Sequence, residues 1–588
     1  MISQHAASRF LTAGIVLVFS VVACAAARGT PRLSAWLVDS LVKVFPSDRA
    51  GTSRRAKADY LAARNQHVSV QLAIRSRAPI EDVTASVPPL IGPADQQISG
   101  IVVHPVGFVV VGSHTPRSPA DERIGVAPGL FPDPLMDFPL NLKSDWTTPV
   151  WITIHVPDRA RPGVYRGEVR VRAGGRILAR VPFRLRVLSA HVPQARTLDV
   201  TNWFNLNPQT SRQFFGVQMF SPSWWTLAAN VAHVLAEYRQ NVILTPLMEL
   251  IQPRNENGNL AYDYSNFDRW VETFQKAGAI GTIEGSHLTT RAAGAYNGAL
   301  MVPVLLAVNG EVQRATLPVG DSRVAPFLTS FLSGLYSHLQ EKGWTKIYLQ
   351  HISDEPHGAE IAWYGKLAAI VHHSMPGIRT IDAVDVSHMP AILQQNVDIW
   401  VPVLSSFDQD MSMIANRVRT DHAVWYYTCI TPQGRYINRF IDFPLVKTRL
   451  LPWLDFRYGL TGFLHWGGNS WTPEPMLDTQ PVINNNQTLL PPGDAFILYP
   501  DRKGLTVRSS IRLEAFRSGI EDYEMLRALS ASHPDEASQL AREAIASFTD
   551  YVRTPGGFRG IERQLLEDSS KPQEAGVFTA PQPAKGFR

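Results

Sequence analysis

Two adjacent acidic residues, Asp354 and Glu355, directly follow a short apolar segment and precede Pro356. Proline cannot donate a hydrogen bond to a sheet, so we expect residues 346–352 to form a strand that ends at the acids. Two carboxylates at the mouth of a buried strand cost free energy unless they are used, and paired carboxylates with separated pKa values perform glycoside hydrolysis. In isolation, the tripeptide is also typical of a helix start with Asp as the N-cap.

A repeating strand and helix pattern surrounds the acid pair. Strand-like apolar segments occur at 198–204, 241–246, 279–284, 346–352, 380–385, 399–404, 424–429 and 462–466. Helical patterns occur at 224–239, 264–277, 324–342, 359–373, 443–458 and 509–529. Eight such alternations predict a (β/α)₈ catalytic barrel over residues 194–530, with a long insertion at 289–322 after the third strand.

The segments on either side of the barrel follow other patterns. Residues 29–193 alternate apolar and polar positions, as in 67–74 and 150–156, and are divided by glycine and proline turns, which predicts an N-terminal β-sandwich. Residues 531–568 predict a C-terminal helical segment, and 569–588 a disordered tail. A chain of 588 residues with 45% hydrophobic and 18% charged residues is an ordinary multidomain globular protein.

The N-terminus resembles an export signal. An apolar run at 10–23 follows Arg9 and is too short to span a bilayer, so residues 1–28 predict a signal peptide and an extracytoplasmic location, whether periplasmic, cell-surface or secreted. Val21 to Cys24 also resembles a bacterial lipobox, in which Cys24 would carry a lipid anchor. The alternative is cleavage near Ala27, which yields a soluble protein. Cys429 is the only other cysteine, so the mature chain has no disulfide partner for it.

The ends of the predicted barrel strands carry polar and aromatic side chains. Active sites of such barrels lie at the carboxyl ends of the strands. Carboxylates move protons there, while tryptophan and tyrosine rings stack on sugar faces. We therefore predict a carbohydrate-binding pocket whose substrate-binding residues are Asn202, Trp203, His287, Asp385, Trp425, Tyr427, His465, Trp466 and Trp471. The net charge is only +5 and no basic run stands out, so nucleic acid is not an expected partner.

The arrangement of the acids favours one mechanism. A retaining glycosidase with a carboxylate nucleophile needs a second acid about 5 Å from the first, across the pocket. The predicted seventh and eighth strands contain no acid. Adjacent acids suit a substrate-assisted reaction instead, in which Glu355 protonates the leaving oxygen and Asp354 orients the 2-acetamido group of the sugar.

An ordered set of short motifs resembles glycoside hydrolase family 123, the β-N-acetylgalactosaminidases. The motifs are FPDPL at 131–135, VP at 156–157 with PGVY at 162–165, HISDEP at 351–356, WYYTC at 425–429 running on to Asn438, GFLHW at 462–466, Gly493-Asp494 with Tyr499-Pro500, SIRLE at 510–514 and GIEDYE at 519–524. The resemblance implies a sandwich followed by a catalytic barrel, no metal, and retention through an oxazolinium intermediate. It also implies that Glu355 is the general acid/base and that Asp354 stabilises the acetamido group.

Two other clusters of charged residues have competing explanations. His351, Asp354 and His357 could be drawn as metal ligands, but Pro356 prevents a helical site, so we expect neither a metal nor another cofactor. The charge-dense run 512–524 predicts a structural helix with ion pairs four residues apart, packed under the barrel.

Three functions from different classes agree with these residues. The leading hypothesis is a secreted or lipid-anchored enzyme that releases terminal β-linked N-acetylhexosamine, in particular N-acetylgalactosamine. The second is a hydrolase of the same fold for another glycan, with a different water-activating residue such as Asp385. The third is a surface protein that binds glycans without cleaving them, although such a protein has no need to keep both acids. A panel of aryl glycosides separates the three.

Overall fold

The computed structural model describes residues 33–51, 58–385, 388–420, 422–483 and 488–571. The predicted signal peptide and Cys24 lie outside this range, as do residues 572–588 of the predicted tail. Residues 569–571 are described, and they are not detached as the tail prediction implies. The Ser570 hydroxyl accepts a hydrogen bond from the backbone N–H of Ala190 at 3.1 Å.

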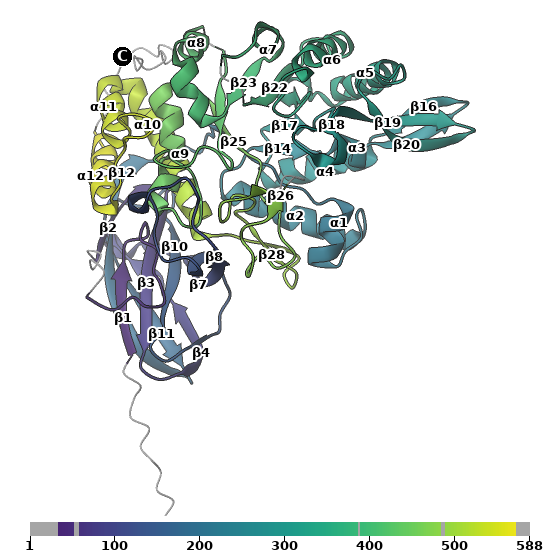
Figure 1. Ribbon diagram of the computed structural model, residues 1–588. Coiled ribbons are helices and arrows are strands. Elements are labelled where there is room, and N and C mark those ends of the chain that lie inside the picture. Colours follow the sequence, from purple (N-terminus) through teal and green to yellow (C-terminus); the bar gives the residue numbers. More distant parts are fainter. Residues whose placement is uncertain (1–32, 52–57, 386–387, 421, 484–487, 572–588) are drawn as a thin grey trace, which may run out of the picture.

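The N-terminal part of the chain is a sandwich of two sheets (Figure 1). One sheet has the order β1 (Leu33–Val38), β3 (His67–Ser76), β10 (Thr147–His155), β7 (Val102–Val111) and β8 (Gly129–Leu135). The other has the order β2 (Asp59–Arg64), β12 (Arg176–His191), β11 (Gly163–Ala173), β4 (Ile80–Ser86) and β9 (Leu140–Leu142), with the short strands β5 (Leu90–Ile91) and β6 (Gln97–Ile98) beside β11. Alternate apolar side chains of both sheets, among them Leu72, Ile152 and Val169, form the core between them.

Eight parallel strands form the barrel. They are β13 (Asp199–Asn202), β14 (Val242–Thr245), β17 (Thr282–Gly285), β21 (Tyr348–Gln350), β22 (Arg379–Val384), β23 (Ile399–Pro402), β24 (Trp425–Tyr427) and β25 (Gly462–His465). Strands β14 to β23 pair in sequence, and β25 pairs with both β24 and β13. Isolated bridges such as Val403 with Tyr427 join β23 to β24, and the Asn241 side chain accepts a hydrogen bond from the Val200 N–H between β13 and β14. This arrangement confirms the predicted sandwich and barrel.

A helix follows each barrel strand. These helices are α2 (Pro222–Glu237), α4 (Ser265–Ala277), α5 (Val324–Lys342), α6 (Glu360–Ser374), α7 (Ala391–Asn396), α8 (Phe407–Arg419), α9 (Leu445–Tyr458) and α10 (Ile511–Ser532). The predicted helices omitted α7 and α8. Two more helices, α11 (Pro534–Ala544) and α12 (Pro555–Asp568), follow beside α10 and the sandwich strands β2 and β12 (Figure 1). None of the helices in the described ranges combines the length and the apolar character that crossing a bilayer requires.

The loops between barrel strands carry additional hairpins and short turns. The insertion after β17 forms a sheet of β18 (Thr290–Arg291), β19 (Leu300–Val308) and β20 (Glu311–Pro318). It projects from the barrel beside the hairpin of β15 (Gln252–Glu256) and β16 (Asn259–Asp263), at the right of Figure 1. Other short elements include α1 (Pro208–Thr210), α3 (Leu247–Leu250), the hairpin β26 (Val482–Ile483) and β27 (Thr488–Leu489), and the hairpin β28 (Tyr499–Asp501) and β29 (Thr506–Arg508).

Helix α10 is the predicted charge-dense helix, but its charges pair differently from the prediction. The Ser510 hydroxyl caps its N-terminus by accepting a hydrogen bond from the Leu513 N–H. Arg512 forms a two-point ion pair with Asp133 of the sandwich at 2.9 and 2.8 Å. Glu521 contacts His67 of the sandwich at 2.7 Å. Among the described residues the ion pair within α10 joins Arg517 to Glu514, three positions apart. The expected pairs four residues apart are wrong because α10 is buried and its charges face other elements.

Candidate active site

A cavity of about 670 Å³ opens at the carboxyl ends of the barrel strands. The acid pair after β21 lies in its wall. Residues that follow β13, β17, β22, β24 and β25 complete the barrel side of this wall, and the insertion that begins at β18 forms part of its rim. The site therefore draws on segments far apart in the sequence, which the closed barrel brings together.

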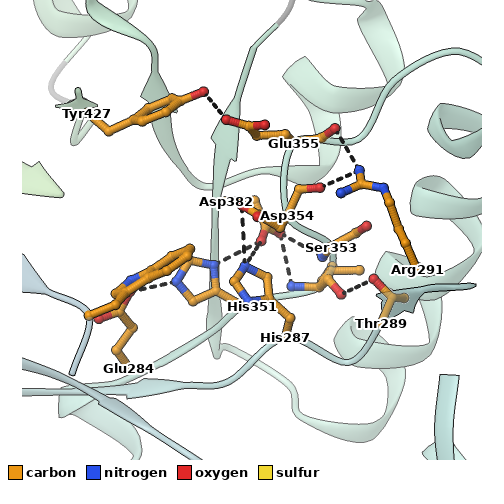
Figure 2. A network of polar contacts seen from close by, with 12 residues as sticks. Glu284, His287, Thr289, Arg291, His351, Ser353, Asp354, Glu355, Asp382 and Tyr427 are labelled. Carbon is orange, nitrogen blue, oxygen red and sulfur yellow. Dashed lines mark hydrogen bonds and ion pairs between the residues drawn. The ribbon is translucent and has the colours of Figure 1, made fainter. Parts of the chain in front are cut away.

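The backbone turns sharply at the acid pair. Glu355 has φ +43°, in the left-handed region that residues with a Cβ rarely adopt. Its N–H donates to the Ala383 carbonyl of β22 at 3.2 Å, and the Tyr427 hydroxyl donates to its carboxylate. Figure 2 shows the Glu355 side chain pointing to Tyr427, while Asp354 lies closer to His287 and His351. The two adjacent carboxylates thus face different parts of the cavity.

The two acids have raised pKa values for related reasons. Burial, followed by the charge of Asp354, raises the pKa of Glu355 to about 8, while the Tyr427 hydrogen bond and Arg291 oppose this shift. Burial also raises the pKa of Asp354, and the cations His351 and Arg291 oppose it. The Asp354 side chain is 44% exposed to the cavity, so solvent lessens the effect of burial until a ligand displaces it. Glu355 is therefore the group that stays protonated near neutral pH.

Arg291, from β18, binds the backbone of the acid pair. Its Nη2 donates to the Asp354 carbonyl at 2.8 Å and to the Glu355 carbonyl at 3.1 Å, as Figure 2 shows. Its guanidinium also forms an ion pair with Glu360 at 2.9 Å, and both of these side chains are 12% exposed. Among the described residues, no lysine or arginine forms an ion pair with the carboxylate of either acid. Arg291 therefore holds the backbone of the acid pair and leaves both carboxylates available.

A buried chain of polar groups lies beneath Asp354. His351 Nδ1 contacts Asp382 at 2.9 Å and its Nε2 contacts Glu284 at 2.7 Å. Asp382 also accepts hydrogen bonds from the Tyr364 hydroxyl and the Ile352 N–H, at 2.6 and 2.9 Å. Burial lowers the pKa of His351, but the two carboxylates outweigh it and raise the pKa to about 10. His351 is therefore an imidazolium that connects the ends of β17, β21 and β22.

His287 lies between this buried chain and the cavity. Its Nε2 is 4.0 Å from Asp354 and 3.6 Å from Asp382, and it has no hydrogen-bond partner within the described part of the chain. Burial and the positive charge of His351 lower the pKa of His287 to about 3, so it is neutral. Ligand atoms of His287, His351 and Asp382 lie within 4.8 Å of one another, as in a metal site. A protonated His351 engaged by two carboxylates has no free nitrogen for a metal.

Five of the nine predicted substrate-binding residues line the cavity: Trp203, His287, Asp385, Tyr427 and Trp466. The Trp203 ring stands edge-on to His287, and its Nε1 donates to Glu284 at 2.9 Å. The Trp466 Nε1 lies 3.3 Å from the Asp494 carboxylate. Both indole N–H groups thus contact carboxylates, that of Glu284 and that of Asp494.

The other four predicted residues lie away from the cavity wall. Trp425 is fully buried in the barrel interior, where its ring covers Gly462, and a Cβ added there would come within 2.5 Å of the ring. His465 is fully buried and accepts a hydrogen bond from the Gly467 N–H. Asn202 binds Gln240 and Arg439 beneath the surface. Trp471 packs on Phe214 and donates to the Leu498 carbonyl. The predicted placement of these four was wrong because strand ends also carry side chains that fill the core.

Several residues of the site were absent from the prediction. Glu284 and Asp382 lie inside apolar strands, and a buried acid requires a partner, which was the available signal. Arg291 lies in the insertion, where no pattern marks it. Asp494, in the loop after β25, also lines the cavity, although it is 0% exposed and burial raises its pKa to about 7. Strands β24 and β25 contain no acid, but the loop after β25 brings Asp494 to the same cavity wall.

Comparisons with known proteins agree with this geometry. Residues 203–529 match "Glycoside hydrolase 123, catalytic domain", and residues 47–173 match "Glycoside hydrolase 123 N-terminal domain". A structure of a family 123 glycoside hydrolase from Clostridium perfringens, described as showing details of glycolipid glycan hydrolysis, is 18% identical with a TM-score of 0.71, over 92% of this chain and 97% of that one.

Two further solved structures are much less similar. An FMN-binding β-glucuronidase from Facaelibacterium prausnitzii has a TM-score of 0.31 at 10% identity, over 79% of this chain and 60% of that one. A Bacteroides ovatus GH5 xyloglucanase has a TM-score of 0.28 at 8% identity, over 79% and 98%. No curated protein matches the chain. The family match covers more than half of the chain and includes the acid pair, and the chain therefore belongs to glycoside hydrolase family 123.

Proposed function

We propose that the protein releases terminal β-linked N-acetylhexosamine, in particular N-acetylgalactosamine, by a substrate-assisted retaining reaction. The observation that carries this proposal is the pair of adjacent carboxylates at the end of β21, which face different parts of one cavity without an arginine or lysine partner among the described residues. The likeness to a family 123 enzyme described as acting on glycolipid glycans supports a glycan substrate of this kind.

In the first proposed step, Glu355 donates its proton to the glycosidic oxygen as the bond from that oxygen to the anomeric carbon breaks. The acetamide oxygen of the sugar forms a bond to the same carbon, which gives a cyclic oxazolinium ion. Asp354, as a carboxylate, accepts the acetamide N–H and stabilises its developing positive charge. In the second step, Glu355 removes a proton from water, which attacks the anomeric carbon and opens the ring.

Asp494 offers the structural alternative, a carboxylate nucleophile in the same cavity wall. Such a nucleophile must be ionised and must reach the anomeric carbon. Asp494 is fully buried, its pKa is raised to about 7, and one of its oxygens lies 3.3 Å from the Trp466 Nε1. These features favour the acetamide as nucleophile.

The test compares aryl 2-acetamido-2-deoxy-β-galactosides with the matching 2-hydroxy galactosides, and both with their gluco counterparts. We expect turnover only with the 2-acetamido group, and a thiazoline analogue of the cyclic ion should bind about 10²-fold or more tightly than the product sugar. Asp354→Asn should lower kcat with little change in binding, whereas Asp494→Asn is the control for the alternative nucleophile. Equal cleavage of 2-hydroxy sugars, or a covalent adduct with a 2-fluoro sugar, would contradict the proposal.

We also propose that the protein acts outside the cytoplasm and is attached to a membrane through Cys24. The lipobox-like sequence that ends at Cys24 supports this proposal. We expect an acylated N-terminal cysteine in the intact mass of the mature protein, and Cys24→Ala should release it from membranes. A mature protein that begins near Ala27 without acyl mass would contradict the anchor.

A further inference from the structure

The turn that carries the two acids is under conformational strain. Glu355 is not glycine, yet its φ is +43°, so its Cβ is held in a backbone region that a glycine would occupy without penalty. Pro356 follows directly and cannot contribute an N–H to hold the turn. Within the segment, His357 Nδ1 lies 2.9 Å from the Glu355 carbonyl, and further contacts reach the turn from other parts of the chain.

Arg291 supplies such contacts from the insertion. One of its nitrogens, Nη2, donates to the carbonyls of both Asp354 and Glu355. Two successive carbonyls can share one donor only when the backbone between them is bent rather than extended, so this pair of hydrogen bonds depends on the turn being kept. The carboxylates of the acids take no part in it.

The position of Arg291 is itself fixed on several sides. The carboxylate of Glu360, in the first turn of α6, accepts hydrogen bonds from Arg291 Nε at 3.1 Å and from Arg291 Nη2 at 2.9 Å. The Tyr296 ring lies 5.1 Å from the guanidinium carbon, and Tyr296 in turn stacks on His357 at 4.5 Å. With Arg291 and Glu360 both 12% exposed, the guanidinium is held in one place rather than sampling solvent.

We propose that Arg291 and Glu360 form a clamp that holds the Asp354–Glu355 turn in its strained form, so that the insertion carrying β18 is a positioning element for the catalytic acids. This inference rests on the proposed function, because Arg291 is assigned the role of positioning Asp354 and Glu355, and their catalytic role is itself proposed. Arg291 is not assigned a contact with the substrate. The insertion is then required for the geometry of proton transfer, in addition to forming the rim of the cavity.

The test uses Arg291→Met, Arg291→Lys and Glu360→Gln in the full chain. The control is Arg314→Gln, since Arg314 lies on β20 of the same insertion and also donates to a backbone carbonyl, that of Met248. We expect Arg291→Met to lower kcat about 10²-fold, the usual effect of misplacing a catalytic group by about 1 Å, with a smaller change in KM. Arg291→Lys should restore part of the loss, because lysine reaches a carbonyl but lacks the fork that engages Glu360.

Two further measurements distinguish positioning from a general loss of structure. Amide hydrogen exchange in peptides covering 351–360 should be faster in Arg291→Met than in wild type, and unchanged in Arg314→Gln. The alkaline limb of the pH profile should move to higher pH, because the charge of Arg291 lowers the pKa of Glu355. If Arg291→Met fails to fold, Glu360→Gln tests kcat and hydrogen exchange with the arginine in place, and no alkaline shift is expected because the charge of Arg291 is kept.

The outcomes separate this inference from the proposed function. The clamp would be overturned if kcat and hydrogen exchange were unchanged in both Arg291→Met and Glu360→Gln and the pH profile were unchanged in Arg291→Met. The proposed function would still stand if the wild type were active and Glu355→Gln inactive. A wild type that cleaves no 2-acetamido glycoside would overturn the proposed function, and hydrogen exchange would then decide the clamp alone.

Discussion

The acid pair after β21 and the helix α10 are both dense in charge, but their charges are satisfied in opposite ways. In α10 the acids and arginines are buried and engage partners on other elements, such as Asp133 with Arg512 and Glu521 with His67. At the acid pair, the nearby Arg291 binds backbone carbonyls instead of the carboxylates. The Asp354 carboxylate faces the cavity, and the histidine nearest to it, His287, is neutral.

This difference indicates which charged residues perform chemistry. A carboxylate in a buried ion pair is stabilised in its charged form by its partner, which opposes the rise in pKa that burial causes. A carboxylate that is enclosed but left without a cation has a raised pKa and can exchange a proton with a ligand. Residues 512–524 include more charged side chains than residues 351–356, yet the segment that lines the cavity is 351–356.

The largest effect should come from removing the proton donor. Glu355→Gln should lower the rate about 10²–10⁴-fold with poor leaving groups, because the departing oxygen then receives no proton. Activated aryl glycosides need less protonation and should lose less. Steady-state kinetics across leaving groups of increasing acidity measures this, and an equal loss for all of them would show that Glu355 is not the leaving-group acid.

Breaking a buried ion pair of α10 should affect stability rather than chemistry. Asp133→Asn leaves Arg512 buried without its counter-charge, and we expect a loss of about 3–5 kcal/mol in the free energy of unfolding. Urea denaturation measures this loss, while kcat per folded molecule should stay close to wild type. A double replacement of both partners by uncharged residues is the control, and it should cost less than Asp133→Asn alone if the unpaired charge is the cause.

The hydrogen bond from Tyr427 should set the upper pH limit of activity. Glu355 must be protonated at the start of the reaction, so kcat/KM should fall as the pH rises through its pKa of about 8. The Tyr427 hydroxyl stabilises the carboxylate and lowers that pKa, so Tyr427→Phe should move the alkaline limb upward. A hydrogen bond to a charged group contributes about 1.5 kcal/mol or more, so the shift should be about one pH unit. A downward shift in the pH profile would contradict this role.

The smallest effect should come from an exposed pair. Arg184 and Asp59 lie on the sandwich with side chains 60% and 56% exposed. Arg184→Gln should change the free energy of unfolding by less than about 1 kcal/mol, because water screens the pair, and activity should be unchanged. Denaturation at low and high salt tests this, and a loss as large as that of Asp133→Asn would remove the distinction between buried and exposed pairs.

The barrel could be predicted from the sequence because its strands are covered on both faces and therefore form apolar runs. All eight predicted segments overlap a barrel strand, although β17 spans Thr282–Gly285 rather than 279–284 and β22 begins at Arg379 rather than 380. The acid pair was visible because Pro356 marks the end of its strand. Trp425 and Tyr427 lie two positions apart on β24 and face the same side of the strand, so only their depth in the barrel separates the buried Trp425 from Tyr427, which lines the cavity.

The contacts that hold the site could not be predicted. Arg291 reaches the acid pair from the insertion, and its partners are backbone carbonyls, which carry no sequence signal. Glu284 and Asp382 bracket His351 from neighbouring strands, a pairing that depends on barrel register. Short-range patterns therefore identified the acids, while long-range geometry decides how they are used.

The ion pairs between α10 and the sandwich have a consequence for how the chain is made. The sandwich is synthesised first, and its Asp133 and His67 stay without their partners until the final barrel helix leaves the ribosome. A nascent chain that stops before α10 would hold a barrel without its last helix and a sandwich whose Asp133 and His67 lack the groups with which they pair. The two units therefore mature as one body, and exchange of either one between relatives should succeed only when the matching charges travel with it.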